Sequence, residues 1–181
     1  MRYFKKICGE RLYLSPINEE DAEIYAKWMN DYSVSSNLTM YAKVINLSFE
    51  REALKRLASQ EHNYAIVLNR KETLIGNISL MDIDNINRTA TLGLFIGEDD
   101  NRNQGYGSEA LRLILNYGFQ TLNLHNIMLF CYSDNEQALG CYKKAGFREF
   151  GRRREAKFKD GTYIDIIYME ILVSRFFGEE E

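Results

Sequence analysis

The residues best suited to chemistry form a short turn-like stretch, Arg102-Asn103-Gln104-Gly105-Tyr106-Gly107-Ser108. The apolar residues 91–96 before it are expected to form a buried strand, and residues 108–122 after it a helix. The first N–H groups of a helix have no partner within it, and the helix dipole favours negative charge there, so the turn suits an anion such as phosphate. Gly105 and Gly107 would let the anion approach closely, because neither has a Cβ. A plain strand-to-helix turn is the alternative, since a short glycine motif alone is weak evidence.

A second group of chemically useful side chains lies in residues 135–147. Ser133 and Glu136 have the spacing of a capping box, which predicts that a helix begins there. Asn135 and Tyr142 are seven positions apart, about two helical turns, so both are expected on one side of that helix. An amide and a phenol would therefore project from the same helix face.

Together the two motifs resemble those of the GCN5-related N-acetyltransferases. In that family a glycine-containing turn holds the pyrophosphate of acetyl-coenzyme A, and an asparagine, a helix, a tyrosine and a Gly-Phe pair follow later. The matching residues here are Arg102, Gly105, Gly107, Asn135, Tyr142 and Gly146-Phe147. The resemblance covers most of the chain and is strongest from residue 89 to 168. It is greatest to the branch of ribosomal-protein N-terminal (RimJ/RimL-like) and spermidine acetyltransferases.

The resemblance implies a binding site for acetyl-coenzyme A as co-substrate. Backbone groups of Leu94, Phe95 and Ile96 would hold the pantetheine arm like an added strand, although core packing explains their side chains equally well. Asn135 would contact the cofactor, although an asparagine at a helix start is also an ordinary cap. The pyrophosphate would bind the N–H groups of Arg102, Asn103, Gln104, Gly105, Tyr106, Gly107 and Ser108.

The same resemblance makes Tyr142 the general acid. A phenol with a pKa of about 10 is protonated at neutral pH and can protonate a departing thiolate. A core tyrosine is the alternative. The general base is not evident, because Thr91 stands where many relatives carry a glutamate. Water could serve instead, and the carboxylate alternatives, each also typical of turns, are Asp82, Asp84 and Glu98.

The implied function is acetyl-coenzyme A-dependent transfer of an acetyl group, by direct attack, to a primary amine of a small molecule or a protein N-terminus. A polyamine such as spermidine is an alternative acceptor, but residues 31–46 supply a single acidic residue, Asp31, for a polycation. A non-catalytic acetyl-coenzyme A sensor or scaffold is a further alternative, and Thr91 is the feature that favours it.

The remaining pattern predicts one α+β domain over residues 1–181, with the mixed, mostly antiparallel sheet, helices on both faces and splayed central strands of the acetyltransferase fold. Residues 33–46 are expected to form a loop, Ser48 to cap a helix, and Asp160-Gly161 to turn a hairpin. Strands are expected at 10–17, 64–68, 74–81, 89–96, 127–132, from 147, and at 164–171, and helices at 19–30, 48–59, 108–122 and 135–145.

Composition narrows the class of protein. A net charge of −3 gives no general attraction to nucleic acid, and no apolar run reaches the length of a membrane span. Three cysteines without metal-type spacing and only two histidines argue against a metal site and favour the reducing cytoplasm. Phe176 and Phe177 either pack on the domain or cover a second copy, so a homodimer is an open alternative.

Overall fold

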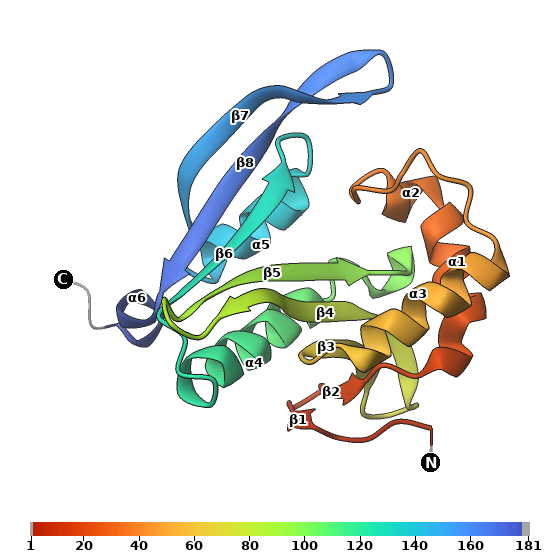
Figure 1. Ribbon diagram of the computed structural model, residues 1–181, viewed down its shortest axis with the longest axis horizontal. Helices are drawn as coiled ribbons and strands as arrows, with labels where there is room; N and C mark the ends of the chain where they lie inside the picture. The colour runs from red at the N-terminus through yellow and green to blue at the C-terminus, as the bar shows by residue number, and fades with distance from the viewer. Residues whose placement is uncertain (1, 179–181) are drawn as a thin grey trace. The chain divides into compact units, whose positions relative to one another are not determined.

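The computed structural model describes residues 2–178 and contains a mixed eight-stranded sheet with helices (Figure 1). The strand order is β1-β2-β3-β4-β5-β6-β8-β7. Strands β5 and β6 pair in parallel, and the registers of β1–β2, β2–β3, β6–β8 and β7–β8 are antiparallel. The strands are β1 (Ile7–Cys8), β2 (Leu12–Pro16), β3 (Asn63–Leu68), β4 (Thr73–Asp84), β5 (Thr89–Ile96), β6 (Asn126–Tyr132), β7 (Arg148–Lys159) and β8 (Thr162–Leu172). The α-helices are α1 (Ala22–Asn30), α2 (Tyr32–Ser35), α3 (Leu47–Ser59), α4 (Tyr106–Gln120), α5 (Glu136–Lys144) and α6 (Val173–Phe177), and 3₁₀ turns lie at η1 (Glu19–Asp21) and η2 (Asp99–Asn101).

The chain forms two compact units, and each contains two separate stretches of sequence. Unit 1 comprises Met1–Ser79 and Gly93–Ile114, and unit 2 comprises Leu80–Leu92 and Leu115–Glu181. Strands β4 and β5 and helix α4 therefore each begin in one unit and end in the other. Neither unit is a contiguous piece of the chain.

In unit 1, helices cover both faces of the sheet. On one side of β5 the Phe95 ring meets the rings of Tyr25 and Trp28 in α1 edge-on, with centroids 6.1 and 5.9 Å apart. On the other side Leu94 and Ile96 face the start of α4. This alternation follows from the period of two along a strand. It confirms, within this unit, helices on both faces.

In unit 2, the alternating residues of β6 separate a buried face from a partly open one. Ile127, Leu129 and Cys131 are buried, whereas Phe130 between them is 40% exposed. Strand β6 pairs along its whole length with β8, so the same alternation continues there. Figure 1 shows α4 and α5 near these strands, and a Cβ on Gly118 of α4 would lie 3.0 Å from Cδ1 of Ile127. Helices therefore cover the side of β6 that carries the buried residues.

The C-terminal aromatic residues pack against α4 of their own chain. The ring centroids of Phe176 and Phe177 lie 5.3 and 6.4 Å from that of Phe119 in α4. The sequence left two alternatives open for this pair, packing on the domain or covering a second copy, and the contacts with Phe119 correspond to the first.

Three local expectations were wrong. Residues 33–46 are not entirely loop, because α2 occupies Tyr32–Ser35 and the Asp31 carboxylate caps it by accepting the Ser33 N–H at 2.8 Å. Asn46, not Ser48, caps α3, and its side chain accepts the Phe49 N–H at 2.8 Å.

The third error concerns the start of α5. Asn135 caps this helix by accepting the Ala138 N–H at 3.1 Å, whereas the Ser133 hydroxyl accepts the N–H of Asp165 at 3.1 Å. The capping-box spacing was therefore misleading, because the serine side chain already serves the neighbouring strand. The hairpin turn at Asp160-Gly161 is confirmed, with φ of +50° and +80°.

Candidate active site

The glycine-containing turn has a backbone that only certain residues adopt. Asn103 and Gly105 have φ of +57° and +78°, and α4 begins directly afterwards at Tyr106, two residues earlier than predicted. The first helical bond runs from the Glu109 N–H to the Gly105 carbonyl at 3.1 Å. The turn is thus followed directly by the N-terminus of α4, a position that favours anions.

Gly107, unlike Gly105, does not have a backbone conformation that requires glycine. Its φ is not positive, and a Cβ built on it would lie 3.9 Å from Cγ1 of Ile96 and 4.0 Å from Cδ2 of Leu94. These are ordinary van der Waals separations, so the protein of unit 1 does not itself exclude a side chain here. Neither the backbone conformation nor the packing of unit 1 therefore requires a glycine at this place.

The side chain of Arg102 is turned back onto the protein. Its Nε donates to the Ile96 carbonyl at 3.2 Å, Nη2 donates to the Gly97 carbonyl at 3.4 Å, and the guanidinium also pairs with Asp99. The Arg102 N–H donates to the Asp99 carbonyl at 2.9 Å. Arg102 thus fixes the chain between β5 and the turn.

Arg11 is a residue of this site that the sequence reasoning missed. Its N–H and Nε donate to the two carboxylate oxygens of Glu109, each at 2.8 Å, and its Nη1 donates to the Gln104 carbonyl at 2.8 Å. Its guanidinium also lies 4.9 Å from the centroid of the Tyr106 ring. Burial alone would raise the pKa of Glu109, yet the bonds and charge of Arg11 hold that pKa below its usual value. Arg11 stabilises the turn and adds positive charge beside it. It lies 98 positions from Glu109, so no sequence motif pointed to the contact.

The predicted pantetheine strand is the end of β5. Its parallel register with β6 runs from Thr89 to Thr91, so Leu94, Phe95 and Ile96 lie beyond the paired residues. Their side chains take part in the core of unit 1, and the Gly97 N–H donates to the Ile75 carbonyl at 2.9 Å. The backbone of this segment is therefore held on its β4 side.

In unit 2, Tyr142 is held in a buried position on α5. The residue is 7% exposed, and its ring meets that of Phe147 with centroids 5.9 Å apart. Burial, followed by the nearby Cys131 and Cys141, raises the pKa of the Tyr142 phenol, which keeps its proton well above neutral pH. The phenol therefore carries a proton at neutral pH, and its raised pKa makes it a weaker acid than an exposed tyrosine. Asn135 lies at the start of the same helix, with its side-chain oxygen used as the cap.

Two of the three carboxylate alternatives for a general base, Asp84 and Glu98, accept hydrogen bonds from neighbouring groups. The hydrogen bonds of Asn87 and Ile86 hold the pKa of Asp84 below its usual value, so Asp84 serves as a turn residue. The bond from Lys27 at 2.9 Å and that from Trp28 do the same for the pKa of Glu98. Asp82 is exposed and has a φ of +51°. Carboxylates with lowered pKa values are weak bases.

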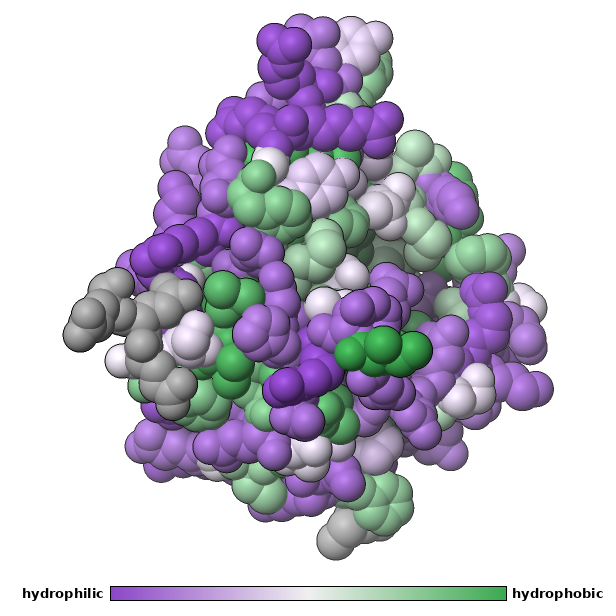
Figure 2. Space-filling view, turned by 60° about the vertical axis from the view of Figure 1, so that its left-hand side comes forward, coloured by the Kyte–Doolittle hydropathy of each residue, from purple (hydrophilic) through white to green (hydrophobic). Residues whose placement is uncertain are grey.

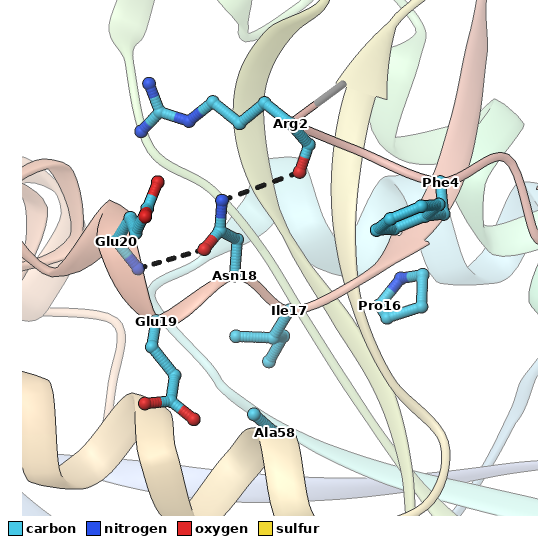
Figure 3. A pocket seen from close by; sticks show the side chains of 8 residues that line it. All are labelled: Arg2, Phe4, Pro16, Ile17, Asn18, Glu19, Glu20 and Ala58. Carbon is cyan, nitrogen blue, oxygen red and sulfur yellow. Dashed lines mark hydrogen bonds between the residues drawn. The ribbon is translucent and has the colours of Figure 1, made fainter.

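A surface pocket of unit 1 contains none of these residues (Figure 3). Its volume is about 430 Å³, and its lining residues are Arg2, Phe4, Pro16, Ile17, Asn18, Glu19, Glu20 and Ala58. Figure 3 shows the Asn18 amide between the Arg2 carbonyl and the Glu20 N–H, so this side chain is explained by capping η1. Within residues 2–178, no helix is both long and apolar enough to cross a membrane, and no group of three or more acidic, histidine or cysteine side chains could hold a metal ion.

Known proteins resemble this chain in sequence and in structure. Spermidine N(1)-acetyltransferase of Vibrio cholerae is 32% identical over 116 residues, which cover 64% of this chain and 66% of that protein. The putative ribosomal N-acetyltransferase YdaF of Bacillus subtilis is 29% identical over 108 residues, which cover 60% and 58%. The alignments thus span just under two thirds of the first relative and less of the second.

The crystal structure of spermidine N-acetyltransferase from Vibrio cholerae in complex with CoA and spermine shares the fold. It is 24% identical, has a TM-score of 0.81, and the match covers 93% of this chain and 99% of that one. The family model of the acetyltransferase (GNAT) domain matches residues 11–148, well over half of the chain. The protein therefore belongs to the GCN5-related N-acetyltransferases, a family of acyltransferase enzymes with this fold.

Proposed function

We propose that this protein transfers the acetyl group of acetyl-coenzyme A to a primary amine by direct attack. One observation carries the proposal. The turn before α4 ends in Gly105, a glycine that its backbone requires, and the first turn of α4 holds a second glycine, Gly107, that the protein's own packing does not require. Acceptors named for relatives, spermidine and a ribosomal component, support an amine substrate.

When bound, acetyl-coenzyme A would supply a thioester whose carbonyl carbon an amine can attack. Of the predicted residues 102–108, those from 103 to 108 would hold the pyrophosphate through their N–H groups, with Arg11 keeping the turn in place. Arg102 is a correction to that prediction, because its N–H already donates to the Asp99 carbonyl at 2.9 Å. The backbone of Leu94, Phe95 and Ile96 would hold the pantetheine arm, and Asn135 would contact the cofactor. Tyr142 would donate its proton to the departing sulfur.

The acceptor would be a small-molecule amine or a protein N-terminus. Among residues 2–178, Cys8, Cys131 and Cys141 form no disulfide, which suits the reducing environment of the cytoplasm. A sensor that binds acetyl-coenzyme A without turnover is the second candidate, because Thr91 cannot act as a base.

Gly107→Ala tests the cofactor site. The added methyl group should fold without strain but occupy space that a phosphate needs, so we expect affinity for acetyl-coenzyme A to fall at least about tenfold, or about 1.4 kcal/mol. Isothermal titration calorimetry measures this, and Gly140→Ala in α5, where a Cβ meets nothing within 4 Å, is the matched control. If a folded Gly107→Ala protein bound acetyl-coenzyme A with unchanged affinity, the pyrophosphate would not bind at this turn.

Release of free coenzyme A from a panel of amines separates the two candidate functions. Turnover with at least one amine supports the transferase. Tight cofactor binding without turnover on any amine supports the sensor.

A further inference from the structure

Positive charge for an anionic ligand has to be supplied locally, because the protein as a whole is negative. Figure 2 shows one face covered largely by hydrophilic side chains, and the chain contains 26 acidic and 23 basic residues, a net charge of −3. Coenzyme A carries negative charge on its pyrophosphate and on its 3′-phosphate, so the overall charge does not attract it. Arg11 of unit 1 is a cation that lies directly beside the glycine-containing turn.

The guanidinium of Arg11 is fixed by contacts within the protein. Its Nε donates to Oε2 of Glu109 at 2.8 Å, and its Nη1 donates to the Gln104 carbonyl, also at 2.8 Å. The guanidinium carbon lies over the Tyr106 ring, 4.9 Å from its centroid. A side chain that is already held in this way loses little conformational freedom when it binds a ligand.

The third guanidinium nitrogen, Nη2, is not used by these contacts. It has no hydrogen-bond partner among residues 2–178, and the Arg11 side chain is 46% exposed. A Cβ built on Gly105 would lie 3.3 Å from Nη2 and 3.9 Å from Nη1 of Arg11. Apart from the chain neighbours of Gly105, no other described atom comes within 4 Å of that position. Nη2 therefore borders an open space beside the backbone of the turn.

The ion pair of Arg11 and Glu109 is oriented with its positive end toward that space. The Glu109 side chain is only 7% exposed, and its two oxygens accept the N–H and the Nε of Arg11. Glu109 lies in the first turn of α4, where an uncompensated carboxylate would repel an anion bound at the helix N-terminus. Arg11 offsets that charge and still presents one nitrogen to solvent.

We propose that Nη2 of Arg11 donates a hydrogen bond to the pyrophosphate of acetyl-coenzyme A, so that Arg11 is itself a binding residue for the co-substrate. The inference rests on the proposed function. The planar guanidinium can hold a carboxylate with one nitrogen and a phosphate oxygen with another in a fixed geometry. Its place beside Gly105 favours the pyrophosphate over the 3′-phosphate, because the turn is the proposed pyrophosphate site.

Calorimetry with two ligands tests which phosphate Arg11 contacts. Acetyl-coenzyme A carries the pyrophosphate and the 3′-phosphate, whereas dephospho-coenzyme A carries the pyrophosphate alone. Arg11→Gln should weaken the binding of both by at least about tenfold, the effect of losing a charge-assisted hydrogen bond. Arg112→Gln, at an exposed position of α4, removes the same charge and should stay within a few-fold of the wild type. A loss confined to acetyl-coenzyme A would assign Arg11 to the 3′-phosphate and overturn the inference.

Variants of Glu109 separate the contact from an indirect effect of the ion pair. Arg11→Gln/Glu109→Gln leaves no unpaired carboxylate, so it should fold even if Arg11→Gln does not, and it should still bind both ligands at least about tenfold more weakly. Wild-type affinity in this double variant would show that Arg11 only offsets the charge of Glu109. Glu109→Gln alone keeps the guanidinium and should bind at least as tightly as the wild type. An equal loss in Glu109→Gln would show that the pair only supports the turn.

The dependence of affinity on ionic strength distinguishes a contact with the ligand from support of the turn. Salt screens an exposed guanidinium–phosphate contact, so the affinity ratio between Glu109→Gln and the double variant should narrow between about 0.1 M and about 1 M salt. A ratio that does not change with salt would overturn the inference and leave the proposed function intact. A wild-type protein that binds neither acetyl-coenzyme A nor dephospho-coenzyme A would overturn the proposed function and this inference together.

Discussion

Gly105, just before α4, and Gly107, in its first turn, illustrate how differently single residues can be constrained. Gly105 has a φ of +78°, so any side chain there strains the backbone whether or not a ligand binds. Gly107 has ordinary backbone angles and room for a Cβ. The sequence suggested the same role for both glycines. The structure shows that a side chain at Gly107, unlike one at Gly105, strains no backbone, so a change in ligand affinity caused by it would not come from strain.

Tyr142→Phe tests the general acid. The ring and its contact with Phe147 remain, but the proton is lost, so kcat should fall by about 10²–10⁴-fold with an unactivated amine. Steady-state kinetics measures the loss, and calorimetry should show unchanged affinity for acetyl-coenzyme A. A mutant with near wild-type kcat, in conditions where chemistry limits the rate, would make Tyr142 a packing residue.

Contacts between residues that are distant in the sequence were not predicted. Arg11 reaches Glu109 and the turn across 98 positions, and Lys157 reaches Tyr132 through a register shift in β7. No spacing rule connects such pairs, because their contact depends on how strands are placed. Tyr142 and Asn135 were found in advance because both lie on one short helix, although their roles in binding and catalysis remain predictions.

Most helices and strands could be located from hydrophobic patterning, because their apolar faces are long and regular. The elements that escaped are short: β1 has two residues, α2 four and α6 five. The caps of α3 and α5 were also misplaced, since serine and asparagine compete for the same role and the choice depends on neighbouring strands. The single domain over residues 1–181 stays a prediction.

Asn135 caps helix α5 and is also predicted to contact the cofactor, so its two roles can be tested separately. Asn135→Ala removes the cap and should cost about 0.5–2 kcal/mol of stability, whereas Asn135→Ser keeps a hydroxyl cap. We expect both variants to bind acetyl-coenzyme A more weakly, because both remove the side-chain amide. Thermal unfolding and calorimetry measure the two effects. Wild-type affinity in Asn135→Ser would leave this residue a cap alone.

For the molecule as a whole, one buried carboxyl makes stability depend on pH. Glu50 in α3 is 4% exposed, its Oε2 has no hydrogen-bond partner among the described residues, and burial raises its pKa. Since the charged form is penalised only in the folded state, this group lowers stability as pH rises above its ordinary pKa of about 4.3.

Glu50→Gln should therefore raise the melting temperature at pH 8, by about 2–4 °C if the buried charge costs about 1 kcal/mol. The gain should shrink as the pH falls from 8 to about 3, where the carboxyl is protonated in both the folded and the unfolded state. Glu52→Gln, at an exposed position on the same helix, is the control. A gain that is the same at both pH values would show that the charge of Glu50 is not the cause.

The interleaving of the two units affects how genes of this kind can be recombined. A single crossover exchanges one contiguous stretch, yet each unit is assembled from two stretches. A crossover between Leu80 and Ile114 would leave at least one unit with a core drawn from two parents, whose side chains were not selected to fit one another. Chimaeras should survive more often when three crossovers, after Ser79, Leu92 and Ile114, exchange a complete unit.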